Sequence, residues 1–207
     1  MTGAAGQARI ILATRNPGKL AELRRILAAA EVGVTVDDLE DVPDMPEVAE
    51  TGRTFRENAL VKARAVAAFT RLPAVADDSG LCVDALNGMP GVLSARWSGR
   101  HGDDKANLDL LLAQLADVPA GRRQAHFACA AALVLPAGGE HVAEGSVYGR
   151  LADAPRGSNG FGYDPIFVPD GHQQTTAELS PAEKDKISHR GRALRALAPV
   201  IAALLGG

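Results

Sequence analysis

The sequence has few aromatic residues, few cysteines and no long apolar run. Phe, Trp and Tyr make up only 4% of its 207 residues, so each ring outside an apolar segment needs an explanation. The two cysteines, Cys82 and Cys129, cannot build a disulfide framework, and we expect reduced thiols in a cytoplasmic protein. No apolar stretch approaches the ~20 residues of a transmembrane helix, and we see no signal-peptide pattern, so we expect no membrane partner.

Neither sign of charge is in clear excess. The chain has 22 Lys and Arg against 25 Asp and Glu, which gives a net charge of −3. A protein that binds DNA or RNA usually has a basic excess, so we do not expect a polynucleotide partner. A small anionic ligand needs only a few well-placed cations and is therefore not excluded. The hydrophobic fraction of 46% and the chain length predict a single folded domain over residues 1–207.

Several common catalytic motifs are also missing. The histidines and cysteines show no HxxxH, HExxH or CxxC spacing, so the sequence does not predict a zinc site. There is no G-x-S-x-G turn and no evident Ser-His-Asp arrangement. The segment 13–20 resembles a phosphate-binding P-loop, but Ala13 replaces its first glycine and Leu20 replaces its Mg²⁺-binding Ser or Thr. We therefore reject a true P-loop.

Apolar runs alternate with helix start signals along the chain. Short apolar or alternating runs predict strands at 8–14, 32–36, 72–81, 124–135 and 141–151, the last two as a hairpin. Capping residues and prolines predict helices that begin at Pro17, at a Thr54–Glu57 capping box, at Asp103 or Asp104, at a Ser180–Glu183 capping box and at Ser188. This order indicates a mixed α/β fold around one extended sheet.

The first candidate site lies between the first strand and the first helix. Unpaired N–H groups and the helix dipole attract anions at such a place, Gly18 permits close approach, and Lys19 adds a full charge. This favours phosphate binding by Thr14, Arg15, Asn16, Pro17, Gly18 and Lys19. The alternative is an ordinary helix start with a surface lysine.

The second candidate is the pair Asp77-Asp78, which we expect at the end of an apolar strand, before a turn at Ser79-Gly80. Carboxylates at a strand end can bind a hard cation or act as a base. Adjacent strand residues face opposite sides, so the two need not face one metal ion. The alternative is a turn in which Asp78 or Ser79 bonds to the backbone. Glu50, in an acidic loop, is either solvated or joins this cluster.

Two further segments carry unusual side chains. Phe161 and Tyr163 lie in a glycine-rich loop, where they either stack on a purine, worth ~1–3 kcal/mol, or fold back onto the core. Asp164 precedes a proline and is typical of a turn. In the segment 184–190, KDKISHR, cations occupy the first turn of the last helix, where the dipole disfavours them. That suits an anionic or carbonyl-bearing ligand, whereas the alternative is a solvated junction.

Taken in order, these segments resemble one family, the inosine triphosphate (dITP/XTP) pyrophosphatases. The matching stretches are LATRNPGKLAEL, ETGRTFRENALVKA, ADDSGLCVDALNGMPGVLSARWSG, GFGYDPIF and AELSPAEKDKISHRGRAL. The resemblance implies an α/β fold with two lobes around a long mixed central sheet and an active-site cleft between the lobes. It also implies a homodimer, Mg²⁺ dependence and hydrolysis of nonstandard purine triphosphates (ITP, dITP, XTP) to a monophosphate and pyrophosphate.

The resemblance also implies a role for each candidate residue. Thr14 to Lys19 resemble the triphosphate cradle, although many members have a small residue where Arg15 stands, so the role of Arg15 is open. Glu50 and Asp78 resemble the magnesium ligands, with Asp78 also as the catalytic base. The remaining positions resemble substrate contacts: Ser79, the purine platform Phe161, Gly162, Tyr163 and Asp164, and the groups that close over the ligand, Lys184, His189 and Arg190.

Three other functions remain open from the sequence. A nucleotide kinase or NTPase acting at the γ-phosphate would release orthophosphate or transfer it, and the incomplete P-loop counts against it. A related pyrophosphatase would act on modified pyrimidine nucleotides. A nucleotide sensor would bind the triphosphate without releasing a product. Product analysis over a panel of triphosphates separates all three.

Overall fold

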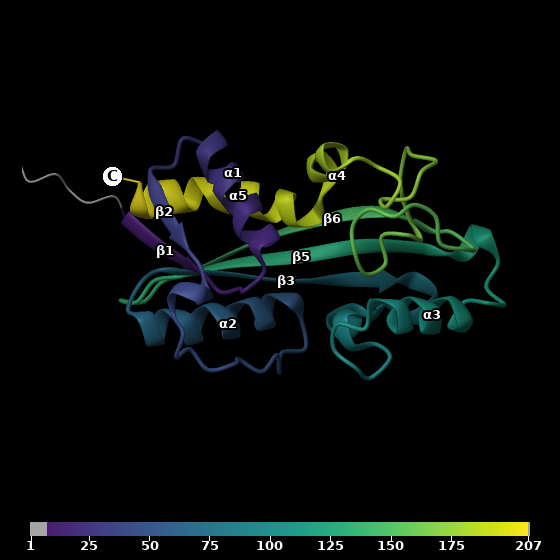
Figure 1. Cartoon of the computed structure of the whole chain (residues 1–207), viewed down its shortest axis with the longest axis horizontal. Coiled ribbons are helices and arrows are strands. Elements are labelled where there is room, and N and C mark those ends of the chain that lie inside the picture. Colours follow the sequence, from purple (N-terminus) through teal and green to yellow (C-terminus); the bar gives the residue numbers. More distant parts are fainter. Residues whose placement is uncertain (1–7, 207) are drawn as a thin grey trace, which may run out of the picture. The chain divides into compact units, whose positions relative to one another are not determined.

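The computed structural model describes residues 8–206, and within them the chain forms a mixed α/β fold (Figure 1). The strands are β1 Ala8–Leu12, β2 Val34–Asp37, β3 Ala74–Val83, β4 Met89–Pro90, β5 Gln124–Val134, β6 Glu140–Leu151 and β7 Phe167–Pro169. The α-helices are α1 Pro17–Ala29, α2 Phe55–Thr70, α3 Asp104–Gln114, α4 Pro181–Ile187 and α5 His189–Leu205. Short 3₁₀ helices are η1 Leu39–Asp41, η2 Asp84–Leu86, η3 Gly91–Arg96 and η4 Ala120–Arg122.

All the strands of the described residues belong to one mixed sheet. Its order is β2-β1-β3-β5-β6-β7, and β4 pairs with β3 outside this path. β1 runs parallel to β2 and β3, whereas β4 is antiparallel to β3 and β7 is antiparallel to β6. β5 and β6 are consecutive neighbours joined by a short turn, which confirms the predicted hairpin.

The chain divides into two compact units. Within the described residues, unit 1 contains 8–78, 130–144 and 191–206, and unit 2 contains 79–129 and 145–190. Each of the strands β3, β5 and β6 contributes residues to both units. The two lobes that the resemblance implies correspond to these units, whereas the cleft stays a prediction.

In unit 1, helices cover both faces of the sheet: α1 and α5 lie on one face and α2 on the other (Figure 1). The α2 face buries small residues at helical spacing, Ala59, Ala63, Val66 and Ala67. They pack on strand residues that are themselves mostly alanine, namely Ala74, Ala76, Ala130 and Ala132, with Ile11 and Val134. The helix that the Thr54–Glu57 pair predicts is thus present, and its apolar face is buried.

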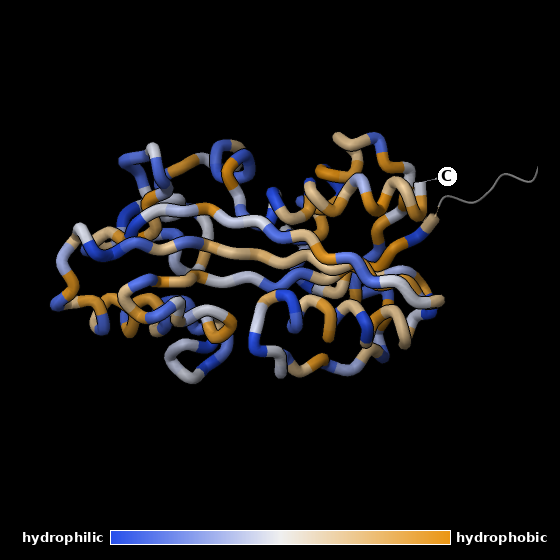
Figure 2. The backbone as a smooth tube through the Cα atoms, turned by 180° about the vertical axis from the view of Figure 1, so that it is seen from behind, coloured by the Kyte–Doolittle hydropathy of each residue, from blue (hydrophilic) through white to orange (hydrophobic). Residues whose placement is uncertain are grey.

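Unit 2 has its own apolar core under α3. Leu108, Leu111 and Leu115 pack against residues of the strands and of the loop before β7, which are Leu81, Val83, Ala125, Val147, Leu151, Tyr163, Ile166 and Phe167. Figure 2 shows the apolar stretches of the long strands, which contribute residues to the cores of the two units. Within residues 8–206, no helix is long and apolar enough to cross a membrane. Neither Cys82 nor Cys129 forms a disulfide, which agrees with the prediction of reduced thiols.

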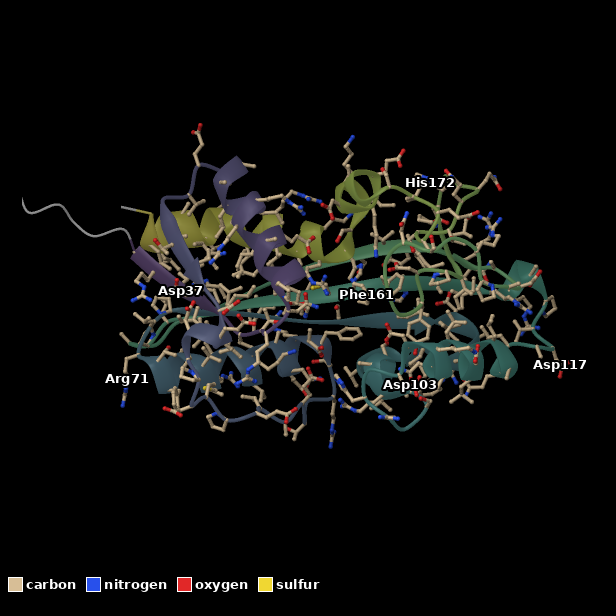
Figure 3. All side chains as sticks on the ribbon, in the orientation of Figure 1. Asp37, Arg71, Asp103, Asp117, Phe161 and His172 are labelled. Carbon is tan, nitrogen blue, oxygen red and sulfur yellow. The ribbon has the colours of Figure 1, made fainter. Side chains whose placement is uncertain are left out.

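The predicted helix caps are present, with one difference. Asp103 caps α3 by accepting a bond from the N–H of Ala106 (Figure 3), and Ser180 forms the full capping box with Glu183. Thr54 accepts a bond from the Glu57 N–H at 3.1 Å, but the Glu57 carboxylate accepts from the N–H of Arg53, not of Thr54. Only the Thr54 half of that capping box therefore forms. The Glu57 carboxylate instead holds Arg53, the residue before Thr54.

The expectation that the third strand ends at Asp77-Asp78 is wrong. β3 continues through Asp78 and Ser79 to Val83, and its last residues pair with β4, Cys82 with Pro90 and Val83 with Met89. Leu81 and Val83 are fully buried in the core of unit 2. Packing and strand pairing therefore outweigh the turn preference of the DDSG sequence.

Candidate active site

The start of α1 is held by its own cap. The Asn16 side chain accepts bonds from the N–H groups of Gly18 at 2.9 Å and Lys19 at 3.3 Å, and the Asn16 N–H donates to Thr14 Oγ1 at 3.1 Å. Pro17 has no N–H, which suits the first helical position. The helix start is thus confirmed, but the expectation that its N–H groups are unpaired is wrong, because Asn16 engages two of them.

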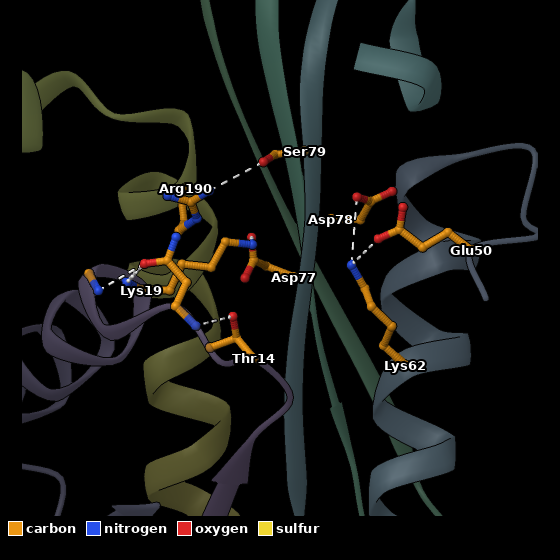
Figure 4. Close-up of polar contacts among 10 residues, drawn as sticks. Thr14, Lys19, Glu50, Lys62, Asp77, Asp78, Ser79 and Arg190 are labelled. Carbon is orange, nitrogen blue, oxygen red and sulfur yellow. Dashed lines mark hydrogen bonds and ion pairs between the residues drawn. The ribbon is translucent and has the colours of Figure 1, made fainter. Parts of the chain in front are cut away.

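Lys19 extends from α1 to the face of β3 that carries Asp77. Its ammonium lies 2.8 Å from Asp77 Oδ2, and the Asp77 side chain is only 4% exposed (Figure 4). The cation that the sequence assigns to a phosphate group is therefore anchored by a buried carboxylate. Charge-assisted bonds of this kind hold a long side chain in one place.

Arg15 makes a contact that the sequence did not predict. Its guanidinium donates to the carbonyl oxygen of Met45 at 3.3 Å. Met45 is buried and lies in the segment that leads to Glu50. Arg15 is therefore connected to the acidic segment. The resemblance leaves the role of Arg15 open, and this bond is one contact that bears on it.

Glu50 and Asp78 meet at a lysine of α2. The Lys62 ammonium lies 2.8 Å from Glu50 Oε1 and 3.7 Å from Asp78 Oδ1 (Figure 4). The structure thus brings together the two carboxylates that the resemblance assigns to magnesium. Sequence reasoning missed Lys62, although a lysine between the buried positions Ala59 and Ala63 of a helix is a signal for a buried charge partner.

Asp78 has a second partner on α2. The Asn58 amide donates to Asp78 Oδ2 at 2.9 Å. The turn of the alternative interpretation, in which Asp78 or Ser79 bonds to the backbone, is absent because β3 continues through both residues. Burial raises the pKa of Asp78, and the attraction of Lys62 and the bond from Asn58 offset only part of that rise. Burial alone would lower the pKa of Lys62, but Asp78, Glu50 and Asp77 outweigh it and raise it. Lys62 therefore stays protonated as an ammonium ion.

The neighbours Asp77 and Asp78 face opposite sides of β3, as strand geometry predicts. Asp77 points toward Lys19 of α1, whereas Asp78 points toward Lys62 of α2 (Figure 4). Asp78 therefore shares the Lys62 ammonium with Glu50, whereas Asp77 pairs with Lys19.

The donor set around Asp78 suits magnesium better than a transition metal. Among residues 8–206, no three His, Cys, Asp or Glu side chains are grouped to hold a metal ion. Mg²⁺ in nucleotide sites is usually held by one or two carboxylates together with water and substrate phosphates. The pair Glu50 and Asp78 is such a set of hard oxygen donors, and the Lys62 ammonium already shows that a cation is stable between them.

In unit 2, the glycine-rich loop exposes one ring. Phe161 is 62% exposed (Figure 3), and the Lys184 ammonium lies 5.1 Å from its ring centroid. Lys184 also pairs with Asp164, which is buried and accepts bonds from the Phe161 N–H at 2.8 Å and the Thr176 hydroxyl at 2.8 Å. Asp164 thus organises the loop that presents Phe161.

Tyr163 behaves differently, and as a platform for a purine ring it is a wrong prediction. Its ring is 4% exposed in the core of unit 2, and its hydroxyl donates to the Ser94 carbonyl oxygen at 2.9 Å. Burial raises its pKa. The intervening Gly162 donates its N–H to Asp104 at 2.9 Å. Tyr163 therefore follows the second alternative and folds back onto the core, whereas Phe161 faces outward and its stacking on a purine stays a prediction.

The last predicted group lies where α5 begins. Arg190 donates to the Ser79 hydroxyl at 3.4 Å (Figure 4). His189 stacks on Phe127 of β5 with a centroid distance of 4.9 Å and an interplanar angle of 10°. His189 and Arg190 are both in the first turn of the final helix, as predicted. Unit 2 thus contains Ser79, Arg190 and His189 in fixed contacts.

Comparison with known proteins identifies the family. A model of the Ham1 family matches residues 10–200. The chain is 62% identical to the dITP/XTP pyrophosphatase of Streptomyces coelicolor, over 96% of this chain and 99% of that protein. Two solved structures are also similar. The nucleoside-triphosphatase / dITP/XTP pyrophosphatase of Mycobacterium abscessus is 61% identical, with a TM-score of 0.79, over 93% of this chain and 99% of that one. A HAM1 protein from Coxiella burnetii is 42% identical, with a TM-score of 0.88, over 95% and 100%. The chain therefore belongs to the Ham1 family, and its resemblance to dITP/XTP pyrophosphatases is confirmed.

Proposed function

We propose that this protein hydrolyses nonstandard purine nucleoside triphosphates (ITP, dITP and XTP) to the monophosphate and pyrophosphate, and so removes them from the nucleotide pool. The observation that carries this proposal is the match over nearly the whole chain to relatives named dITP/XTP pyrophosphatase, at 62% identity. The arrangement of charges around Asp78 and Lys19 supports it, because both sides of β3 carry groups suited to a phosphate reaction.

The start of α1 binds the triphosphate in this proposal. The positive end of the helix and the Lys19 ammonium attract phosphate oxygens. Because Asn16 occupies the N–H groups of Gly18 and Lys19, phosphate either displaces its side chain or binds beside it. Thr14 offers a hydroxyl, and Arg15 adds a second cation close to the same turn.

Glu50 and Asp78 would hold Mg²⁺. When bound there, Mg²⁺ supplies positive charge that stabilises the phosphate oxygens and the pyrophosphate leaving group. The close contact of both carboxylates with the Lys62 ammonium supports this assignment, because it shows how strongly the pair favours a cation.

Asp78 is the base for the attacking water. The water oxygen forms a bond to the α-phosphorus, Asp78 accepts the water proton, and the bond from the α-phosphorus to the bridging oxygen breaks. The bonding electron pair leaves with pyrophosphate. Burial raises the pKa of Asp78, which makes it a stronger base than an exposed aspartate, and Lys62 and Asn58 help to keep it ionised.

Unit 2 recognises the base in this proposal. The exposed ring of Phe161 stacks on the purine, and the loop residues Gly162 and Asp164 and the cation of Lys184 surround that ring. The guanidinium of Arg190, which donates to Ser79, has further N–H groups that can donate to a 6-carbonyl. At the same helix turn, the imidazole ring of His189 offers a further N–H donor. Adenine has an amino group at position 6, so it leaves such donors unpaired and is rejected.

We also infer a homodimer that acts in the cytoplasm. The family resemblance supports the dimer, and two cysteines that form no disulfide fit a reducing compartment. Sedimentation of the purified protein tests the oligomeric state: a mass of two chains supports the inference, and a mass of 21.5 kDa contradicts it.

A panel of purine and pyrimidine triphosphates, with and without Mg²⁺, tests the function. We expect equal amounts of pyrophosphate and monophosphate from ITP, dITP and XTP, much less from ATP and GTP, and no turnover without the metal ion. Release of orthophosphate would support an NTPase that acts at the γ-phosphate. A preference for dUTP or methylated pyrimidines would support the related pyrophosphatase, and binding without a product would support a sensor.

A further inference from the structure

Asn58, near the start of α2, is a polar residue that is completely buried. Its exposure is 0%, and both ends of its amide group are used. Oδ1 accepts a bond from the Gly52 N–H at 2.7 Å, and Nδ2 donates to Asp78 Oδ2 at 2.9 Å. Since one partner only donates and the other is a carboxylate, the orientation of the amide is fixed by chemistry. All three residues belong to unit 1.

The approach of Gly52 to Asn58 requires glycine. A Cβ atom on Gly52 would lie 2.7 Å from Asn58 Oδ1, 2.9 Å from the Asn58 nitrogen and 2.6 Å from Glu57 Cβ. Two of these contacts are to backbone or to the base of a side chain, so they cannot relax by a rotamer change. The glycine two residues after Glu50 therefore has a packing reason.

The first turn of α2 holds the same segment by further bonds. The Arg53 N–H donates to the Glu57 carboxylate at 2.6 Å, and the N–H groups of Glu57 and Asn58 both donate to Thr54, the former to its hydroxyl and the latter to its carbonyl oxygen. Asn58 thus projects from a capped helix start, and its amide has little freedom. Because the Asn58 amide is rigid, its bond fixes the Asp78 carboxylate relative to α2.

We propose that Asn58 is a positioning residue for the reaction. It ties the backbone beside Glu50 to the carboxylate of Asp78, and so sets how the two carboxylates lie relative to each other. Its bond to Oδ2 also turns Oδ1 of Asp78 toward Lys62. The effect on turnover rests on the proposed function, whereas the link between Gly52, Asn58 and Asp78 does not.

The substitution Asn58→Asp tests this role. Aspartate has nearly the same shape and keeps an acceptor for the Gly52 N–H, but it replaces the donor to Asp78 by a second acceptor. Loss of such a supporting bond typically costs about 10–100-fold in activity, and we expect that loss in kcat with KM changed by less than about threefold.

Asn107 offers a matched control. It is 1% exposed, and its Oδ1 accepts bonds from the N–H and hydroxyl of Ser98 while its Nδ2 donates to the Ala95 carbonyl oxygen. The substitution Asn107→Asp also turns a buried amide donor into an acceptor, but far along the chain from Asp78. We expect it to lower the melting temperature while kcat stays within about twofold of the wild type. Equal kcat losses in the two variants would overturn the proposal.

A double-mutant cycle on the protein without Mg²⁺ or substrate gives a second readout. In the combination of Asn58→Asp and Asp78→Asn, the donor and the acceptor exchange places and the bond is restored. We therefore expect the double variant to recover most of the melting temperature that Asn58→Asp loses. Asn107→Asp should show no such recovery with Asp78→Asn.

The outcomes separate this inference from the proposed function. If the wild type releases pyrophosphate but the melting-temperature changes of the two single variants simply add in the double variant, the positioning role is overturned and the proposed function is not. Coupled changes in a wild type that releases no pyrophosphate would overturn the function and leave the structural link intact. If Asn58→Asp alone does not fold, a folded double variant supports the proposal, and an unfolded one overturns it.

Discussion

Two adjacent aspartates of β3 are one residue apart and have different surroundings. Asp77 forms an ion pair with Lys19 of α1, whereas Asp78 lies in a network with Asn58 and Lys62 that also includes Glu50 (Figure 4). Burial raises the pKa of Asp78 even though a cation is close. Strand alternation therefore places the cation that we propose for phosphate binding and the carboxylate that we propose as the base on opposite sides of β3, although their two aspartates are adjacent in the chain.

The glycine-rich loop repeats this contrast. Phe161 is exposed and Tyr163 is buried, although only Gly162 separates them. One ring is available to a ligand, and the other anchors the loop through Ser94. In both places, two residues that look equivalent in the sequence have different surroundings, and the proposed function assigns only one of each pair a direct part in the reaction or in base recognition. Each of the following predictions tests one of these contrasts.

The largest expected effect is that of Asp78→Asn. The variant keeps its shape and can still bond to neighbours, but it cannot accept the water proton, so kcat should fall about 10²–10⁴-fold. Steady-state pyrophosphate release and circular dichroism check turnover and folding. Asp77→Asn is the matched control and should raise KM more than it lowers kcat, because it changes the partner of Lys19. A near wild-type kcat for Asp78→Asn would show that Asp78 is not the base.

The next effect concerns Lys62→Met. Loss of the ammonium leaves Glu50 and Asp78 facing each other without their cation, which should lower the free energy of unfolding by about 1.5–3 kcal/mol. Because a metal ion can take the same position, Mg²⁺ should raise the melting temperature of this variant more than that of the wild type. Thermal unfolding with and without Mg²⁺ measures both. Equal Mg²⁺ effects in the two proteins would argue against the magnesium assignment.

Phe161→Ala should separate recognition from stability. Base stacking on an aromatic ring is worth about 1–3 kcal/mol, so kcat/KM for dITP should fall by about 5–150-fold. The ring is 62% exposed, so the melting temperature should change little. Phe161→Tyr keeps the stacking face and should retain most of the activity. Unchanged kcat/KM in the alanine variant would remove Phe161 from the site.

Tyr163→Phe gives the smallest effect and the opposite pattern. It removes one buried hydrogen bond to the Ser94 carbonyl oxygen, which should lower the free energy of unfolding by about 1 kcal/mol. Denaturant unfolding measures that loss. If the variant kept full stability but lost affinity for the nucleotide, the assignment of Tyr163 to the core would be mistaken.

Local sequence rules predicted much of the fold. Helices begin where expected at Pro17, at Ser180 with Glu183 and at Asp103, because these start signals depend on neighbouring residues alone. The third strand was misjudged at Asp77-Asp78, since its continuation depends on pairing with β4 and on the burial of Leu81. Tertiary contacts decided that element, and they leave no local mark in the sequence.

The site was predicted in part for the same reason. Sequence periodicity could not predict that Glu50 lies close to Asp78. Glu50 is in a loop, and the two carboxylates meet only through the Lys62 ammonium of α2. Asn58 and Lys62 were overlooked, although both are polar residues near the apolar face of a predicted helix. A buried polar position needs a partner, and that signal is readable from sequence once the helix face is known.

Hydrolysis of dITP in ¹⁸O-labelled water tests the central claim most directly. If Asp78 activates water for attack on the α-phosphorus, mass spectrometry will find the label in the nucleoside monophosphate and unlabelled pyrophosphate as the other product. Label in pyrophosphate, or labelled orthophosphate, would place the attack at another phosphorus and contradict the account.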